Sequence, residues 1–121
     1  MTATATDRRT DEREARVYLD PMAAAVKANL GALAVLDASG NAKPGVTGTG
    51  LIARGRFEET KDNTAGAAGA LTVRIKSGCF GFATDGSITR ANIGKNVYIV
   101  DDQTVAATDG TATRSAAGVL K

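Results

Sequence analysis

Large apolar side chains are scarce in this chain, and this scarcity limits the core that one copy can build. Leu, Ile, Val and Phe supply 24 of the 121 residues, whereas Ala, Gly and Thr supply 52. Independent folding becomes doubtful when the large apolar residues fall to about one fifth of a chain. A single copy would therefore have a thin core, and we expect partner subunits to supply part of the missing burial.

The residue types that are missing exclude several functions. With no histidine, the chain has no His-based triad, no His metal site and no imidazole for acid–base catalysis. Its one cysteine, Cys79, has no partner for an internal disulfide, and its place beside Phe80 predicts a small buried apolar side chain. We therefore expect no enzyme, no catalytic residue, no metal and no cofactor.

Charge and hydropathy exclude two further classes of partner. The net charge of +2 is too small for binding nucleic acid by charge alone. The longest run of small apolar residues, Ala23–Leu36, is interrupted by Lys27, Asn29 and Gly31 and falls short of the ~20 apolar residues that a membrane helix requires. We expect a soluble protein, made in a cytoplasm, that binds neither nucleic acid nor membranes.

Alternating side chains between regularly spaced turns predict an all-β fold. Residues 71–76 (LTVRIK) alternate strictly between apolar and polar side chains, as in a half-buried strand. Residues 97–100 (VYIV) are apolar on both faces and predict the most central strand. Because turn residues recur roughly every 8 to 12 positions, we expect a small β-barrel or β-sandwich.

Residues 21–30 carry two conflicting patterns. Asp20 and Pro21 would begin a short alanine-rich helix that ends at Gly31. Residues 26–31, however, alternate as a strand does. We favour a strand because everything downstream is β.

Five short segments carry turn or bend signals. Residues Asn63–Ala70 (NTAGAAGA) have little side-chain volume and predict a flexible loop. The change of phase at Ser77–Gly78 indicates a bulge or a strand bend. Thr89–Gly94 predicts one helical turn, Asp101–Asp102 predicts a turn, and Asp109–Gly110 predicts a hairpin that leads into the last strand.

Two arginines form the most compact basic spot in the sequence. In the strand expected at Leu51–Thr60, alternation puts Gly55 and Phe57 on one face and Arg54 and Arg56 on the other. The pair is either part of a solvated strand face or a contact for an acidic partner surface. We carry Arg54 and Arg56 forward as candidate contacts.

The N-terminal segment differs from the rest of the chain in composition. Eight of the ten residues at 7–16 are charged, four of each sign, so this segment has nothing to bury. We expect an extended charged arm at residues 1–19, followed by a single β domain at 20–121. The arm is either a solvated terminus or a segment that becomes ordered only against another subunit. Its candidate contacts are Arg8, Arg9, Arg13 and Arg16, since a guanidinium can hold a carboxylate with two hydrogen bonds.

Four stretches of the chain resemble a known family. They are residues 94–105 (GKNVYIVDDQTV), 6–9 (TDRR), 31–37 (GALAVLD) and 114–118 (RSAAG). Together they resemble small proteins that tailed phages and Mu-like prophages encode beside the major head subunit, and which look like capsid decoration, or cement, proteins. The similarity covers most of the chain, and the string IVDDQTVA is fairly specific for that family.

The resemblance implies a structural role on the capsid surface of a virion. The implied partners are the major capsid protein and further copies of the chain, most simply in a homotrimer. An alternative is a β binding module on the virion surface that recognises a host glycan or protein. With no Trp, two Tyr and three Phe, the chain has few of the aromatic platforms on which glycans usually bind.

Overall fold

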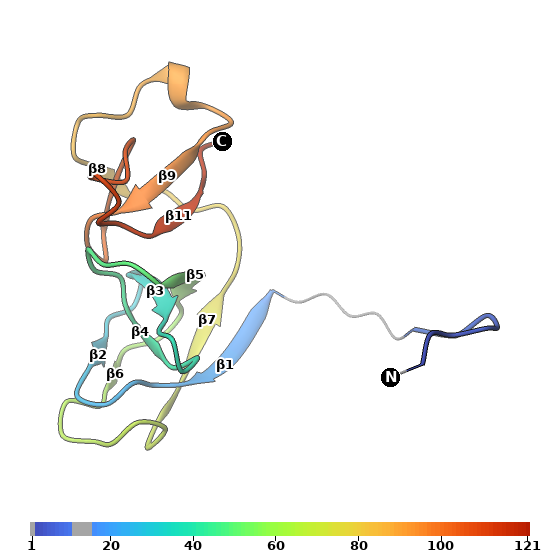
Figure 1. Cartoon of the computed structure of the whole chain (residues 1–121). Coiled ribbons are helices and arrows are strands. Elements are labelled where there is room, and N and C mark those ends of the chain that lie inside the picture. Colours follow the sequence, from blue (N-terminus) through green and yellow to red (C-terminus); the bar gives the residue numbers. More distant parts are fainter. Residues whose placement is uncertain (1, 11–15) are drawn as a thin grey trace.

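The computed structural model describes residues 2–10 and 16–121, and the body of the protein consists of β-strands in two main sheets (Figure 1). One sheet has the order β1-β7-β5-β3-β4 and is antiparallel throughout. Its strands are β1 (Val17–Pro21), β3 (Leu33–Leu36), β4 (Ala42–Pro44), β5 (Ile52–Phe57) and β7 (Thr72–Lys76). The other sheet has the order β11-β9-β10-β8. Its strands are β8 (Ala83–Thr84), β9 (Asn96–Ile99), β10 (Thr104–Ala106) and β11 (Ala116–Val119).

A two-stranded ribbon of β2 (Lys27–Ala28) and β6 (Lys61–Asp62) completes the body. This architecture confirms the all-β prediction. Over the described residues none of the three sheets closes into a barrel, so the barrel form of that prediction is wrong. The main sheets instead lie one above the other in Figure 1.

The core is divided into two clusters by the five-stranded sheet. One cluster contains Phe57 and Ile75 and is otherwise made largely of small residues, including three buried alanines. The other joins the two main sheets, because Leu33 and Val35 of β3 pack with Ile99 of β9. β3 therefore has buried side chains on both of its faces, and it holds the two layers together.

Residues 21–30 form no helix. Pro21 ends β1, Met22 is fully buried, and β2 begins at Lys27, so the strand interpretation is closer to the structure. The predicted helical turn is present as the 3₁₀ helix η1 (Arg90–Asn92), in which the amide of Thr89 donates to the side chain of Asn92 (2.8 Å).

The hairpin predicted at Asp109–Gly110 does not form, since β10 and β11 lie on opposite sides of β9. Gly110, Thr111 and Ala112 all adopt left-handed backbone conformations, with φ of 62°, 64° and 62°. The carbonyl of Asp109 accepts hydrogen bonds from the amides of residues 113 and 114 (2.9 and 3.0 Å). This tight loop returns the chain to the far edge of β9 instead of pairing β10 with β11.

Two segments differ in detail from their predictions. β1 begins at Val17, three residues before the expected domain boundary at residue 20, because the backbone pairs with β7 from Val17 onward. The glycine-rich segment 63–70 is anchored: Asn63 is buried, and its amide nitrogen donates to the carbonyls of Ala23 (2.9 Å) and Ala67 (3.1 Å). A Cβ on Gly66 would collide with the Asn63 side chain, so glycine is required there.

Candidate interaction surface

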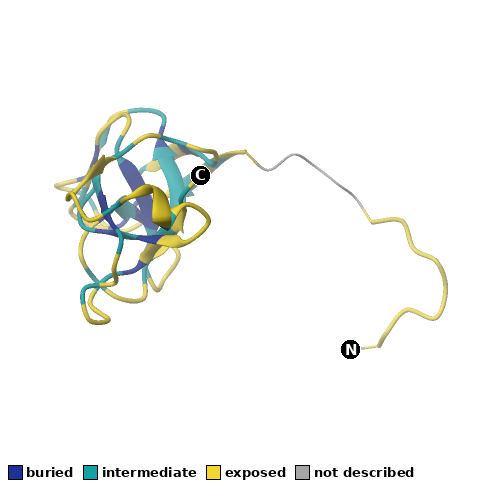
Figure 2. Cartoon of the chain, turned by 90° about the horizontal axis from the view of Figure 1, so that it is seen from above, coloured by how far each residue is buried: buried dark blue, intermediate teal, exposed yellow. Residues whose placement is uncertain are grey.

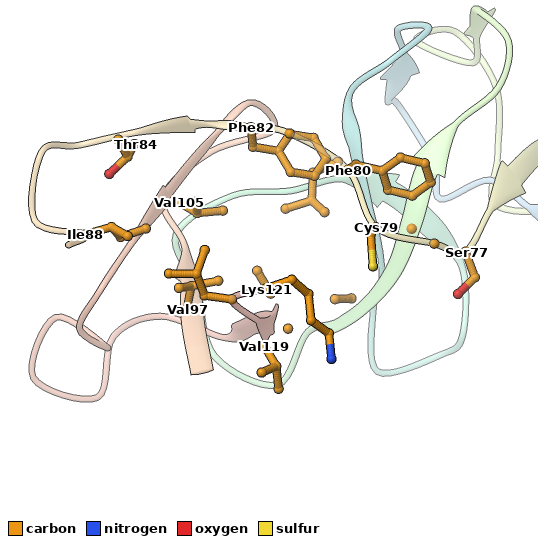
Figure 3. A pocket seen from close by; sticks show the side chains of 18 of the residues that line it. Ser77, Cys79, Phe80, Phe82, Thr84, Ile88, Val97, Val105, Val119 and Lys121 are labelled. Carbon is orange, nitrogen blue, oxygen red and sulfur yellow. The ribbon is translucent and has the colours of Figure 1, made fainter. Parts of the chain in front are cut away.

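A half-open groove of about 510 Å³ lies between the two main sheets. Its lining is mostly apolar, and Figure 3 shows Val97, Val105 and Val119 on one side of the space and Cys79 and Phe80 on the other. The volume falls within the roughly 300–1,000 Å³ of typical ligand clefts. The groove can therefore hold a short segment or a small molecule, but not a folded domain.

The groove exists because the chain leaves the first sheet abruptly. β7 ends at Lys76, and the next strand, β8, begins at Ala83 in the other sheet. The change of phase predicted at Ser77–Gly78 is thus a crossover between sheets and not a bulge within one strand. The crossover residues form one wall of the groove.

Two strand edges border the same groove. β11 is the edge strand of its sheet, and its residues Ala117–Val119 line the groove. β5 pairs with β7 only at Arg56 and Phe57, so its earlier residues have no β7 partner in the described register, and Ala53–Gly55 line the groove. An edge strand presents unpaired N–H and C=O groups. The walls thus offer backbone hydrogen-bonding groups as well as apolar side chains.

Cys79 is exposed, which contradicts the buried position expected from its neighbour Phe80. It belongs to the crossover, where no strand fixes which side chains point inward, so sequence adjacency to Phe80 carried no information about its burial. Its thiol lines the groove.

Arg54 does not share a face with Arg56, because a β-bulge separates them. Ala34 and Val35 lie opposite Gly55 and Ala53, which leaves Arg54 as the extra residue. Gly55 is required at this point, since its φ is +146° and a Cβ would collide with the carbonyl oxygen of Lys76. The bulge redirects the Arg54 side chain and breaks the simple alternation assumed from the sequence.

Arg54 contacts β1 across β7. Its guanidinium donates to both carboxylate oxygens of Asp20 (2.8 and 3.2 Å) and stacks 3.5 Å from the centroid of the Tyr18 ring. The hydrogen bond to Asp20 raises the pKa of Arg54, and the Coulombic attraction of the same carboxylate also raises it. Partial burial of the guanidinium acts in the opposite direction and lowers the pKa. We call Arg54, Asp20 and Tyr18 the β1 clamp.

Arg56 has a different set of partners. It donates to Glu58 (2.8 and 3.0 Å), and its guanidinium lies 4.4 Å from the centroid of the Phe80 ring. Each arginine of the expected basic spot is thus already paired with a carboxylate of the same chain. The structure does not bring them together as one basic contact, and the sequence alone gave no sign of Asp20 and Glu58 as their partners.

The arm lies apart from the body. Every described residue from Thr2 to Thr10, which includes Arg8 and Arg9, is exposed (Figure 2). Arg16 adjoins β1, and its carbonyl accepts a hydrogen bond from the amide of Ser77 (2.7 Å). Arg13 lies outside the described residues.

The acidic pair Asp101–Asp102 forms the turn between β9 and β10, as predicted. Asp101 accepts a hydrogen bond from the amide of Gln103 (2.9 Å), and this bond is the main reason that its pKa lies below the usual value. Within residues 2–10 and 16–121 no group of three or more His, Cys, Asp or Glu side chains is placed to hold a metal ion. The same part of the chain has no helix of the length and apolar character needed to cross a bilayer.

Comparison of the chain with protein-family models, with curated protein sequences and with solved structures gives no match. The functional argument therefore depends on the chain's own surfaces.

Proposed function

We propose that this protein is a structural component of a phage head that binds the lattice of the major capsid protein and stabilises the assembled shell. The observation that carries the proposal is the combination of a small β body with an extended arm whose described residues are all exposed. A cement protein needs surfaces that fit a lattice and no reaction centre. The resemblance of residues 94–105 to decoration proteins supports the same function.

Exposed apolar side chains on the body support a role in subunit contacts. Val17 and Leu19 of the edge strand β1 are 53% and 63% exposed. Large apolar side chains on an unpaired edge strand favour association with another surface. A homotrimer would use such contacts and would suit a local threefold point of an icosahedral lattice, where three subunits can bridge neighbouring capsomers.

Stabilisation would follow from mass action. A protein that binds the assembled shell and not the free capsid subunit shifts the equilibrium toward the shell. Exposed ion pairs of the arm would contribute only about 0–1 kcal/mol each. Three linked copies nevertheless bind with an effective concentration that makes weak contacts sufficient.

Co-sedimentation tests the proposal directly. Heads assembled from the proposed partner, a major capsid protein, are mixed with increasing amounts of the purified protein and pelleted. We expect saturable binding at a fixed ratio to the major subunit, and no binding to the unassembled subunit. Binding to host surface glycans or envelope proteins, with none to heads, would favour the alternative function of a host-binding module.

A further inference from the structure

We propose that the groove between the two sheets receives residues Thr2–Thr6 from the arm of a second copy, which add as a strand to the edge of β11. This inference deepens the proposed function, on which it rests, because it names the surface that links copies of the chain. It follows from four features of the molecule: the shape of the groove, the pattern of the segment, the charges beside the groove and the reach of the arm.

The groove is built to take an extended segment. Strand edges of β5 and β11 border it, and Leu33, Phe82, Val97 and Val105 supply apolar contacts. A peptide that adds to an edge gains main-chain hydrogen bonds, and its alternate side chains enter the space beside the strand. The incoming segment does not need bulky side chains, because the two strand edges that border the groove contain small residues, among them Gly55 and Gly118.

Residues 2–6 have the sequence TATAT, which alternates threonine and alanine without Gly or Pro. β-branched threonine favours extended structure, and every amide in the segment can donate to a neighbouring strand. The segment carries no charged side chain, so none would be buried in the apolar groove. In the structure it forms no strand, and the hydroxyl of Thr4 donates only locally, to the carbonyl of Thr6 (2.7 Å).

Charge favours the register in which Asp7 lies at the mouth of the groove. Among the described residues that line the groove, the side chains charged at neutral pH are both cationic, Arg54 and Lys121. Arg54 is held by Asp20, so Lys121 is the cation available to the arm. Asp7 directly follows the segment, and its carboxylate can pair with Lys121.

The arm is long enough to reach the groove of a second copy, and its described residues lie apart from the body of their own chain (Figure 2). Ten residues, 7–16, separate Thr6 from the start of β1, and ten residues span at most about 33–36 Å. This reach is comparable to the size of a domain of roughly 100 residues, whose radius of gyration is about 13 Å. Each copy carries one arm and one groove, so in a closed head-to-tail ring every arm occupies a groove and every groove is filled.

The single native cysteine provides the test, because Cys79 lines the groove. Thr4→Cys is introduced into the full chain, and the purified protein is oxidised and separated without reductant. We expect disulfide-linked oligomers larger than a dimer, which the parent chain cannot form with Cys79 alone. Ser39→Cys, at an exposed turn in the body, is the matched control and should not exceed the dimer.

Two results of the oxidation would overturn the inference. One is a monomer in which both thiols are consumed, because the arm would then occupy its own groove. The other is cross-linking no greater than that of Ser39→Cys, which would leave the groove for another molecule, such as a segment of the capsid protein. Neither result bears on co-sedimentation with heads, so the proposed function is tested separately.

Thiol accessibility gives a second measurement without any added cysteine. Deletion of residues 2–6 should increase the rate at which a soluble disulfide reagent modifies Cys79 several-fold, at concentrations where the protein is oligomeric. Thr2, Thr4 and Thr6 replaced together by serine serve as the control, since this segment keeps its length and amides. Equal rates for the deletion and the parent chain would contradict occupation of the groove by the arm.

Discussion

We expect Arg54 to contribute more to stability than its position near the surface suggests. Its side chain is 29% exposed and that of Asp20 is 14% exposed, so their two hydrogen bonds are partly shielded from solvent. Hydrogen bonds to charged groups contribute about 1.5–3 kcal/mol, more than neutral ones. Stacking on Tyr18 adds a cation–π contact. The β1 clamp thereby fixes the strand from which the arm emerges.

Arg54→Lys should lower the free energy of unfolding by about 1–2 kcal/mol, because lysine keeps the charge but loses the two-pronged geometry and the planar stack. Chemical denaturation measures the change. Arg56→Lys is the matched control: its ion pair joins residues two apart, the arginine is 36% exposed, and the expected loss is below about 0.5 kcal/mol. Equal effects of the two substitutions would show that the clamp has no special role.

The ionisation of Asp101 makes the stability of the folded protein depend on pH. Its hydrogen bond from the amide of Gln103 stabilises the ionised form, so the pKa in the folded state lies below the unfolded value of about 3.9. The stabilisation is present at neutral pH and is lost as the pH falls through the folded pKa.

Asp101→Asn should therefore be less stable than the parent chain at pH 7, and this difference should shrink below about pH 4 and vanish at lower pH. Thermal unfolding at a series of pH values measures the difference. If the gap between the two proteins were the same at pH 7 and pH 2.5, the carboxylate charge would not be the source of the stabilisation.

At the level of elements, β3 and β9 carry the packing between the two layers. Val35 and Ile99 are fully buried where the sheets meet, and Val73 is fully buried on the other face of the five-stranded sheet. Because three of the seven buried residues in the larger cluster are alanines, each large side chain supplies a high share of the buried apolar surface.

Val73→Asp and Ile99→Asp should each prevent folding, since an unpaired buried charge costs several kcal/mol, comparable to the whole stability of a small domain. Far-ultraviolet circular dichroism and solubility report the outcome. Thr72→Asp, at an exposed position of the same strand as Val73, should remain folded. Soluble, cooperatively unfolding protein from both core variants would refute the assignment of the strand faces.

The prediction from sequence was reliable where local patterns decide the structure. Alternation located β7, and continuous apolar residues located β9 as an inner strand of its sheet. The prediction was wrong at Asp109–Gly110, where consecutive left-handed residues replace a hairpin, and at Gly55, where a bulge ends the alternation. Both errors concern backbone conformations. The residue types at these positions permit several conformations, and the neighbouring strands determine which of them is adopted.

Much less of the candidate site than of the fold could be predicted from the sequence. The groove depends on where the chain crosses from one sheet to the other, and nothing in the residues 77–82 fixes that path. The partners of Arg54 and Arg56 could not be identified because ion pairs between strands depend on register. Asn63 was missed for a related reason: its burial follows from long-range contacts with Ala23, forty residues away.

At the level of the whole molecule, the thin core and the exposed side chains of β1 favour association. The free protein should be a homotrimer, and multi-angle light scattering at micromolar concentration measures its mass. Because the proposed contacts consist mainly of apolar side chains and main-chain hydrogen bonds, the mass should change little with salt. A stable monomer would contradict this expectation and would confine oligomerisation to the surface of the head.

Deletion of residues 2–10 should leave the body folded, because every described residue of the arm is exposed and none belongs to the core of its own chain. Occupancy on heads should fall, since each copy loses contacts that are multiplied over the lattice. The combined variant Arg8→Lys and Arg9→Lys is the control that keeps the charge and loses two-pronged hydrogen bonding. Full occupancy by the truncated protein over a range of salt concentrations would show that the arm makes no contact that matters for binding to heads.

The loop at residues 110–112 also bears on chirality. An L-residue in the left-handed region costs roughly 1–2 kcal/mol, because its Cβ approaches the following carbonyl oxygen, and Thr111 and Ala112 adopt this conformation one after the other. A D-amino acid has the opposite preference. In a chemically synthesised chain, mirror-image alanine at position 112 would therefore fit this loop better than the natural enantiomer, whereas achiral Gly110 has no such preference.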